Sequence, residues 1–310
     1  MSILLVLACS NEFMLTTMDE PDRPVRDSAM PEDTGVFEDT AVEEEAEEEP
    51  EEEEPNNEEP PEEEPEDPAP EDDCEGTSDL VYVVSRDDKG LYLFDPDSLG
   101  FEKLGELECD IYTSPNSMAV ARDGVAYVRY SDDTVYEVEL DSLRCTETSY
   151  GSGSGGGFGS FGMGFATDSK DTWRDKLYIA NANSLAVLDT DTWTLSGVGS
   201  MPSQSELTGN AEGELWAFLP LESPAELVQI SKDSGSVVDK HKLPGFPSPY
   251  DIDAFAFATW DGHFYLFVSE YGMGRSTDVY EVSPSGDMEK VSSDVGFDVV
   301  GAGVSTCAPS

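Results

Sequence analysis

The chain returns five times to a nine-residue pattern, and this repeat limits the folds that it can adopt. Each copy has apolar residues at its first and fourth positions, and four of the five place Asp followed by Ser or Thr near the end. The copies span residues 91–99, 135–143, 185–193, 227–235 and, more weakly, 279–287, so that they start 44, 50, 42 and 52 residues apart. A period of about 40–50 residues that contains several short strands is typical of propeller blades.

The rest of each unit supplies the other strands of a four-stranded sheet. A strand containing an aromatic residue precedes each copy, and ahead of it lies a strand rich in small residues, as crowding at a propeller axis requires. The segment 162–167, Gly-Met-Gly-Phe-Ala-Thr, returns at 301–306 as Gly-Ala-Gly-Val-Ser-Thr, after which no strand follows. We therefore predict that this terminal strand joins residues 80–84 in one blade and closes a ring. The expected fold is an all-β, five-bladed β-propeller, or a six-bladed one if the glycine-rich segment 150–159 contains further strands.

The N-terminus resembles that of bacterial lipoproteins. Val6-Leu7-Ala8-Cys9 matches the lipobox, in which a peptidase cuts before a cysteine that then carries diacylglycerol. No Lys or Arg precedes the apolar run, so residues 1–9 are interpreted as a truncated lipoprotein signal. The resemblance implies lipidation of Cys9. It also implies an extracytoplasmic protein anchored in the outer membrane or at the cell surface of a Gram-negative bacterium.

Residues 10–73 form a second region, dominated by Glu, Pro and Asp. Such a segment buries too little apolar surface to offset its chain entropy, so we expect a disordered, extended acidic stalk. The propeller is then expected to span residues 74–310.

The chain contains five cysteines, one in the lipobox-like segment and four from residue 74 onward. Cys9 is the predicted lipidation site. Cys74 lies just before the first strand and Cys307 just after the last, so ring closure would make them neighbours. Cys109 and Cys145 occupy corresponding outer regions of the first two blades. An even number of cysteines in an exported chain favours disulfides, and we predict the pairs Cys74–Cys307 and Cys109–Cys145.

The formal net charge of −52 is shared by both regions. Residues 1–76 hold 30 Asp and Glu against 2 Arg, and the remainder holds 38 acidic residues against 14 basic ones. Nucleic acid is excluded as a partner, because phosphate binding needs clustered Lys and Arg. The expected partner is a protein or glycan at the cell surface, bound by a monomer. No cofactor is predicted, although calcium is a candidate ligand for the acidic groups.

The candidate site consists of polar residues where the inner strands begin, since these strand ends line the central funnel of a propeller. They are Asn116, Ser117, Glu206, Thr208, Asp251 and Asp253. Convergent carboxylates there could bind a cation or a sugar, or act as an acid/base pair. Glu206 and the pair Asp251/Asp253 lie in separate blades, and they are the residues whose convergence would support hydrolysis.

Other motifs point to structure rather than chemistry. His241 and His263 are expected in exposed loops or turns without an orienting carboxylate, so neither is a candidate catalytic base. The Asp-x-Asp pairs that begin at Asp95 and Asp189 lack the third oxygen and the glycine of a calcium loop, and they are expected to cap turns.

The repeats as a whole resemble those of NHL and YVTN-type bacterial propellers over residues 77–307. That resemblance implies extracytoplasmic recognition of proteins or glycans. Two functions stay open: a surface-displayed binding or scaffold module, which we prefer because no catalytic constellation is evident, and a carbohydrate- or lactone-active hydrolase that uses the funnel carboxylates, with or without calcium.

Overall fold

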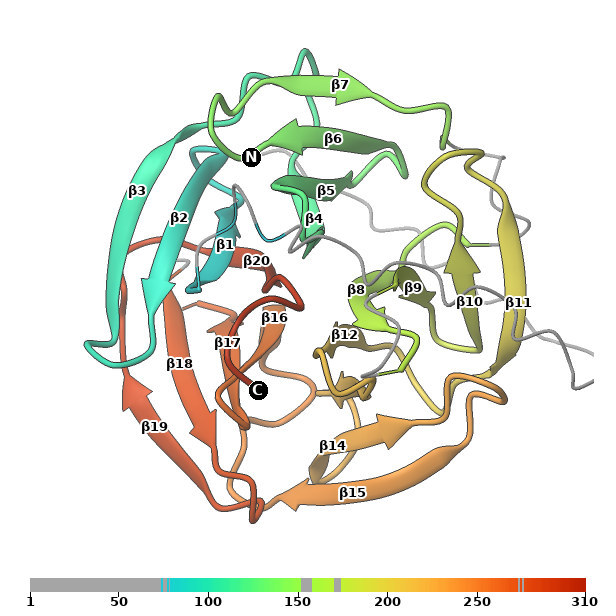
Figure 1. Cartoon of the computed structure of the whole chain (residues 1–310). Coiled ribbons are helices and arrows are strands. Elements are labelled where there is room, and N and C mark those ends of the chain that lie inside the picture. The colour runs from blue at the N-terminus through green and yellow to red at the C-terminus, as the bar shows by residue number, and fades with distance from the viewer. Residues whose placement is uncertain are drawn as a thin grey trace, which may run out of the picture. The chain divides into compact units, whose positions relative to one another are not determined.

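A computed structural model describes residues 74, 77, 79–151, 158–169, 174–272, 274 and 276–310. Over these residues the regular structure is entirely β-strand, arranged as five four-stranded antiparallel sheets (Figure 1). Cys9 and the acidic segment 10–73 lie outside the described residues. Within the described part of the chain, no helix has the length and apolar character needed to cross a bilayer.

Each sheet is one blade of a propeller, with its strands ordered from the axis outward. Blade 1 holds β20 (Val299–Gly303), β1 (Val81–Ser85), β2 (Gly90–Asp95) and β3 (Gly100–Glu106). Blade 2 holds β4 (Pro115–Val120), β5 (Val125–Tyr130), β6 (Val135–Glu139) and β7 (Cys145–Glu147). Blade 3 holds β8 (Gly162–Thr167), β9 (Asp175–Ala180), β10 (Ser184–Leu188) and β11 (Leu195–Ser200). Blade 4 holds β12 (Glu206–Gly209), β13 (Leu215–Leu219), β14 (Ala225–Ile230) and β15 (Val237–Leu243). Blade 5 holds β16 (Ile252–Trp260), β17 (His263–Glu270), β18 (Thr277–Val282) and β19 (Met288–Ser292).

The five inner strands form a closed ring around the axis. β20 contacts β4, β4 contacts β8, β8 contacts β12, β12 contacts β16, and β16 contacts β20 again. This closure confirms the five-bladed fold and rules out the six-bladed alternative. As predicted, the C-terminal strand β20 completes the first blade: it pairs with β1, placing Tyr82 opposite Gly303 and Val83 opposite Ala302.

Small residues at the axis allow the inner strands to approach closely. A Cβ atom added at Gly162 would lie 2.2 Å from the carbonyl oxygen of Ser205, and one at Gly164 would lie 2.7 Å from that of Leu207. Farther out, aromatic rings fill the space between blades. The rings of Trp216 on β13 and Phe264 on β17, for example, lie 4.8 Å apart. The small and aromatic positions of the repeat therefore match different distances from the axis.

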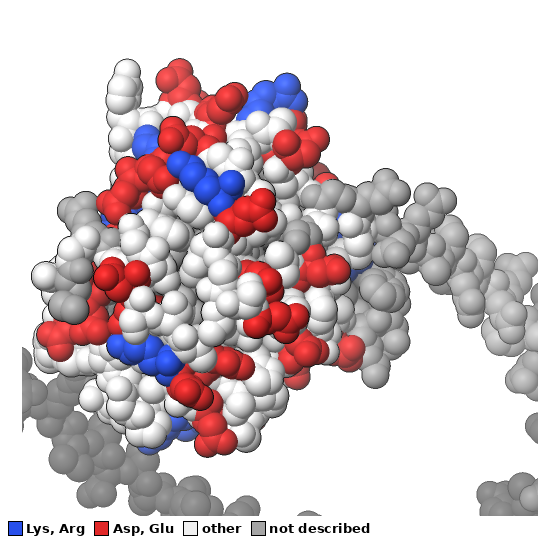
Figure 2. All heavy atoms as spheres, turned by 90° about the vertical axis from the view of Figure 1, so that its left-hand side faces the viewer, with Lys and Arg blue, Asp and Glu red and all other residues white. Residues whose placement is uncertain are grey.

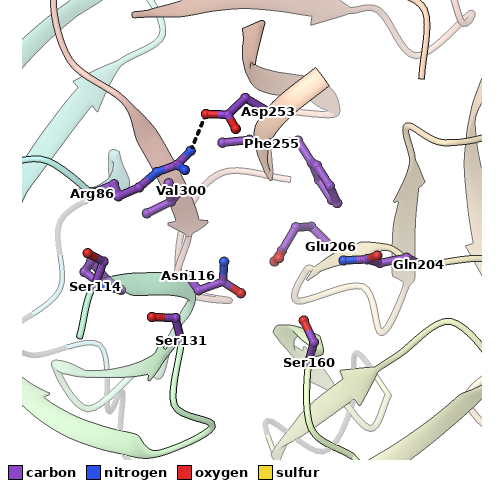
Figure 3. A pocket seen from close by; sticks show the side chains of 12 residues that line it. Arg86, Ser114, Asn116, Ser131, Ser160, Gln204, Glu206, Asp253, Phe255 and Val300 are labelled. Carbon is purple, nitrogen blue, oxygen red and sulfur yellow. Dashed lines mark hydrogen bonds and ion pairs between the residues drawn. The ribbon is translucent and has the colours of Figure 1, made fainter. Parts of the chain in front are cut away.

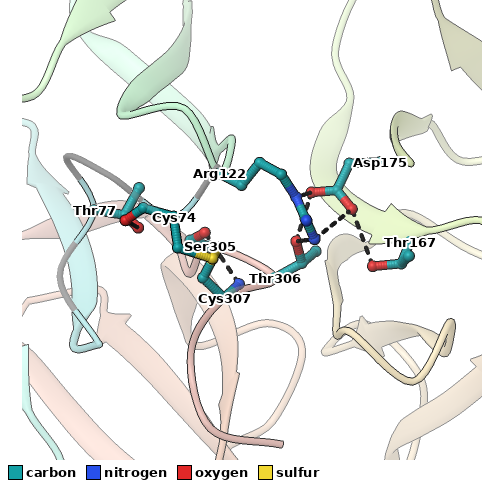
Figure 4. Close-up of a disulfide and its surroundings, with 8 residues drawn as sticks. All are labelled: Cys74, Thr77, Arg122, Thr167, Asp175, Ser305, Thr306 and Cys307. Atoms are coloured by element: carbon teal, nitrogen blue, oxygen red, sulfur yellow. Dashed lines mark hydrogen bonds and ion pairs between the residues drawn. A yellow bond between two sulfur atoms is a disulfide. The ribbon is translucent and has the colours of Figure 1, made fainter. Parts of the chain in front are cut away.

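Two disulfides, both with the predicted partners, tie the ring together. Cys74 and Cys307 are 233 residues apart in sequence, with Cα atoms 5.8 Å apart (Figure 4). Cys109 and Cys145 link the first two blades. Next to Cys307, the hydroxyl of Thr306 accepts from Arg122 Nη2 at 2.8 Å and donates to Asp175 Oδ2 at 2.5 Å. The C-terminal segment is thus bonded to blades 2 and 3 as well as to blade 1.

Local expectations outside the funnel were partly right. Asp95 and Asp189 cap turns as predicted, because their carboxylates accept from the backbone N–H groups of Asp97 and Asp191. The placement of His241 in a loop was wrong. His241 lies on the outer strand β15, and its ring stacks on that of Trp216 with 5.8 Å between centroids.

Candidate functional site

The candidate site is a cavity of about 330 Å³ at the end of the axis where the inner strands begin (Figure 3). Every blade contributes to its lining. The polar side chains are those of Arg86, Ser114, Asn116, Ser131, Ser160, Gln204, Glu206 and Asp253. The apolar part comes mainly from Pro115, Phe255 and Val300. Amide and hydroxyl groups outnumber ionisable ones in this lining.

Backbone bulges turn three of these side chains into the cavity. On β4, Pro115 faces Tyr130 and Ser117 faces Arg129, which leaves Asn116 without a partner in the ladder. Asp253 on β16 is skipped in the same way between Ile252 and Ala254, and so is Val300 on β20. A bulged residue leaves the strict alternation of a strand, and bulges are common where a site needs a side chain re-aimed. The same irregularity in three blades therefore shapes the mouth of the funnel.

Below the mouth, the inner strands form a ring in which a single residue is large. Blades 1, 2, 3 and 5 place Gly301, Ser117, Gly162 and Ala256 at this level of the ladder, whereas blade 4 places Glu206. The space left by its small neighbours is the space that the Glu206 side chain occupies. At Gly162, an added Cβ would lie 3.0 Å from the carboxyl carbon of Glu206.

The carboxyl group of Glu206 is held as a neutral acid at pH 7. The residue is 6% exposed, and its Oε2 atom accepts a 2.7 Å hydrogen bond from the Ser117 hydroxyl on the facing blade. Burial raises the pKa of Glu206 from 4.5 to about 8, against the opposing effects of Ser117, Arg129 and the backbone of Met163. Burial disfavours the charged form of a carboxyl group more than one hydroxyl donor favours it.

Arg86, between β1 and β2, forms ion pairs with two carboxylates. Its Nη2 atom lies 3.1 Å from Asp253 Oδ2 and 2.6 Å from Asp298 Oδ2. Asp298 has a fully buried side chain and also accepts a hydrogen bond from the Ser269 hydroxyl. Burial raises the pKa of Asp298, and both Ser269 and Arg86 oppose that shift. The Arg86 charge is thus matched inside the protein, as a partly buried guanidinium requires.

Arg129 plays a similar part behind Asn116. Its side chain is 2% exposed, and its Nη2 atom lies 2.5 Å from Asp133 Oδ1. It also donates to the carbonyl oxygen of Gly159 and to Asn116 Oδ1. Because Arg129 holds the amide oxygen, the amide nitrogen of Asn116 is turned toward the cavity (Figure 3). The arginine therefore positions a neutral donor instead of presenting its own charge.

The predicted residues divide into three groups. Asn116, Glu206 and Asp253 line the cavity, and Ser117 lies against it through its bond to Glu206. Thr208 lies two residues further along β12, where its hydroxyl accepts from the backbone N–H of Thr259 at 3.2 Å, so it does not reach the cavity.

Asp251 precedes the bulge in β16, is exposed, and does not line the cavity either. The cavity is also lined by Arg86, Gln204 and Phe255, which were not predicted because they lie on loops or at a strand position without a polar pattern.

A histidine–carboxylate pair contradicts one expectation. His263 Nδ1 lies 2.6 Å from Glu281 Oε1, so this histidine does have an adjacent carboxylate. The pair joins neighbouring strands β17 and β18 at the end of blade 5 opposite the funnel, and neither residue lines the cavity. Among the described residues, no group of three or more His, Cys, Asp or Glu side chains is arranged to hold a metal ion.

Comparisons with known proteins leave the function open. No protein-family model and no curated protein matches the chain. Similar solved structures include a protein of unknown function from Bacteroides caccae, 13% identical with a TM-score of 0.39, where the match covers 72% of this chain and 97% of that one. A chain of the mitotic checkpoint complex is 12% identical with a TM-score of 0.39, covering 74% and 79%. The extracellular domain of a putative hybrid two-component system from B. thetaiotaomicron is 9% identical with a TM-score of 0.38, covering 69% and 28%.

Proposed function

We propose that the chain is an extracytoplasmic binding module whose funnel takes a neutral saccharide. The observation that carries this proposal is that the polar side chains left available in the cavity are uncharged. Its ionisable groups are matched internally or neutral: Arg86 pairs with two carboxylates, and the pKa of Glu206 is raised to about 8. What remains for a ligand is a set of amides and hydroxyls on blades 2, 3 and 4.

This lining suits a hydroxyl-rich ligand. The amides of Asn116 and Gln204 and the surrounding serine hydroxyls both donate and accept hydrogen bonds, as sugar hydroxyls do. Phe255 adds an apolar surface of the kind that packs against the C–H face of a pyranose ring. A small-ligand site usually combines an apolar surface with a few polar groups that point toward the ligand.

Charge argues against an anionic ligand. From Thr77 on, the chain holds 38 acidic residues against 14 basic ones. The side of the propeller seen in Figure 2 carries Asp and Glu at many places, with Lys and Arg at only a few places between them. A surface of one sign repels ligands of the same sign during approach. A neutral glycan escapes this repulsion.

We place this module outside the cytoplasm, anchored by lipid on Cys9 and held off the membrane by the acidic segment 10–73. Two disulfides support the first part, because such bonds persist in oxidising compartments. The lipobox-like Val6-Leu7-Ala8-Cys9 supports the second. Cys9→Ala tests it: the variant is expected in the soluble fraction, whereas continued co-sedimentation with membranes would contradict anchoring at this residue.

Binding is tested by calorimetric titration of the full chain with neutral cello-, manno- and malto-oligosaccharides and with an oligogalacturonide as the charged comparator. Gln204→Ala removes one cavity amide and is expected to weaken binding of a neutral sugar by up to about tenfold. Gln229→Ala is the matched control, because Gln229 lies on β14 away from the cavity. Absence of binding by every neutral sugar, or preference for the charged one, would contradict the proposal.

A second candidate function, glycoside hydrolysis, is favoured by the contrast between Glu206 and Asp253. A neutral carboxylic acid and an ion-paired carboxylate at one cavity are the two forms that a general acid and a base or nucleophile require. Glu206→Gln separates the candidates. A binding module keeps its affinity with the amide, whereas a hydrolase loses turnover of aryl glycosides while it still binds them.

A further inference from the structure

A second hollow lies beside the funnel, on the same face of the propeller. It has a volume of about 740 Å³ and is formed by two loops. One is the connection between β13 and β14, from Leu221 to Pro224, and the other is the segment from Phe246 to Tyr250 that leads from blade 4 to blade 5. We call this hollow the rim groove.

The rim groove and the funnel are continuous along the chain. The segment from Phe246 to Tyr250 lines the groove, and Asp253, Ala254 and Phe255, which begin three residues after Tyr250, line the funnel. A ligand chain that leaves the funnel over blade 5 would therefore meet the rim groove next.

The wall of the rim groove is rigid. Pro247 and Pro249 fix their own backbone φ angles, and Phe246 packs edge-on against Phe218 with ring centroids 5.4 Å apart. The backbone N–H of Asp251 bonds to Ser248 O at 2.9 Å, and that of Tyr271 bonds to Asp251 O at 2.8 Å. A wall held in this way loses little conformational freedom when a ligand binds.

Two exposed aromatic residues lie at this wall. Tyr250, in the wall itself, is 90% exposed, and Tyr271, which follows β17 and whose backbone N–H bonds to Asp251 O, is 64% exposed. Among the described residues, the only other large exposed aromatic is Tyr112, before β4 on the same face. Single exposed apolar side chains are common on protein surfaces, but Tyr250 and Leu221 are both exposed and line the same hollow, and grouped apolar exposure of this kind is typical of a ligand-binding groove.

We propose that the rim groove is a second subsite, in which Tyr250 in the groove lining, with Tyr271 beside it, stacks on further pyranose units of the neutral glycan whose end occupies the funnel. This inference rests on the proposed function. The C–H faces of pyranose rings are apolar, as are Leu221, Pro224, Phe246 and Pro247 in the groove. Glu222 is the one ionisable carboxylate in the lining, and it disfavours an acidic polysaccharide. The occupant is thus a neutral glycan chain longer than the funnel alone can hold.

The test measures affinity against chain length. The full chain is titrated with neutral oligosaccharides of one to six units, taken from the series that binds the funnel. Affinity is expected to rise once the chain is long enough to leave the funnel, and Tyr250→Ala is expected to remove about tenfold of that rise without changing affinity for the shortest ligand. Tyr250 is exposed, so the substitution leaves the core intact. Tyr112→Ala, across the ring between blades 1 and 2, is the matched control and should change nothing.

The outcomes separate the two proposals. Binding that is independent of chain length, or a rise that survives Tyr250→Ala together with Tyr271→Ala, overturns the subsite and leaves the funnel function standing. No binding by any saccharide overturns both. A change in the sedimentation coefficient of the unliganded protein on Tyr250→Ala would show that the groove is covered by a second copy of this chain, and it too would overturn the subsite.

Discussion

Replacing Glu206 by Gln should stabilise the protein by an amount that grows with pH. Its folded-state pKa of about 8 lies well above the ordinary value of 4.5, so between these values the native state holds a proton that the unfolded chain has released. The contribution of Glu206 to the free energy of unfolding is therefore fully present below about pH 4.5, and it is lost as pH rises toward 8. Gln cannot ionise and escapes this loss.

The magnitude follows from the size of the shift. Each unit of pKa difference corresponds to about 1.4 kcal/mol, so the loss approaches about 3 kcal/mol at pH 7 and about 5 kcal/mol above pH 8. These values are ceilings, because Glu206 lines a cavity into which water can enter. The amide should keep the local geometry, since the Ser117 hydroxyl can rotate to accept from the new Nε2 group.

Urea unfolding of the full chain at pH 5, 7 and 9 measures the effect. The difference in free energy of unfolding between Glu206→Gln and the parent should widen by about 3–4 kcal/mol from pH 5 to pH 9. Glu102→Gln, an exposed glutamate on the outer strand β3, is the matched control, and its difference should stay constant. A constant difference for Glu206→Gln as well would refute the conclusion that this carboxyl is held neutral by burial.

Two further predictions concern the ring itself. Gly162→Ala should destabilise the protein by about 3 kcal/mol, because the new Cβ would lie 2.2 Å from Ser205 O, whereas Gly197→Ala, where nothing lies within 4 Å, should shift the melting temperature little. Replacing Cys74 and Cys307 together by Ser should lower the free energy of unfolding in urea by about 5 kcal/mol at most, and the same change at Cys109 and Cys145 by about 4 kcal/mol, since the closed segments are 233 and 36 residues long. Equal melting temperatures for the two alanine variants, or a larger loss for the shorter segment, would contradict these arguments.

The fold could be read from the sequence because its constraints repeat. Each blade must place small residues at the axis and aromatic residues farther out, so the same pattern returns in every unit. The copy of the inner-strand pattern at Gly301 was predicted to pair with the first strand of the domain. The structure confirms this, because β20 pairs with β1. The disulfide between Cys74 and Cys307 then followed from topology alone, because closure brings the two ends of the domain into one blade.

The site could be read only in part, because its geometry depends on exceptions to the repeat. Asp251 and Asp253 are two residues apart and would share a face in a regular strand, yet the bulge in β16 aims Asp253 at the cavity while Asp251 stays outside. The residue types in that stretch do not predict a bulge. Arg86 was missed for a different reason: its partner Asp253 is 167 residues away, and only the closed ring brings them together.

The neutral state of Glu206 links the two candidate functions. Its position in the ring is otherwise filled by Ser, Gly or Ala, so a carboxyl group there carries a desolvation cost that an amide would avoid. For binding alone, Gln supplies a hydrogen-bond donor and an acceptor at the same place with a smaller desolvation cost. A Glu206→Gln variant that is more stable and binds sugar as tightly as the parent would therefore show that the proton of Glu206 is dispensable for binding. Loss of glycoside turnover in that same variant would then assign the proton to catalysis, since transfer of a proton is the one thing that the carboxylic acid can do and the amide cannot.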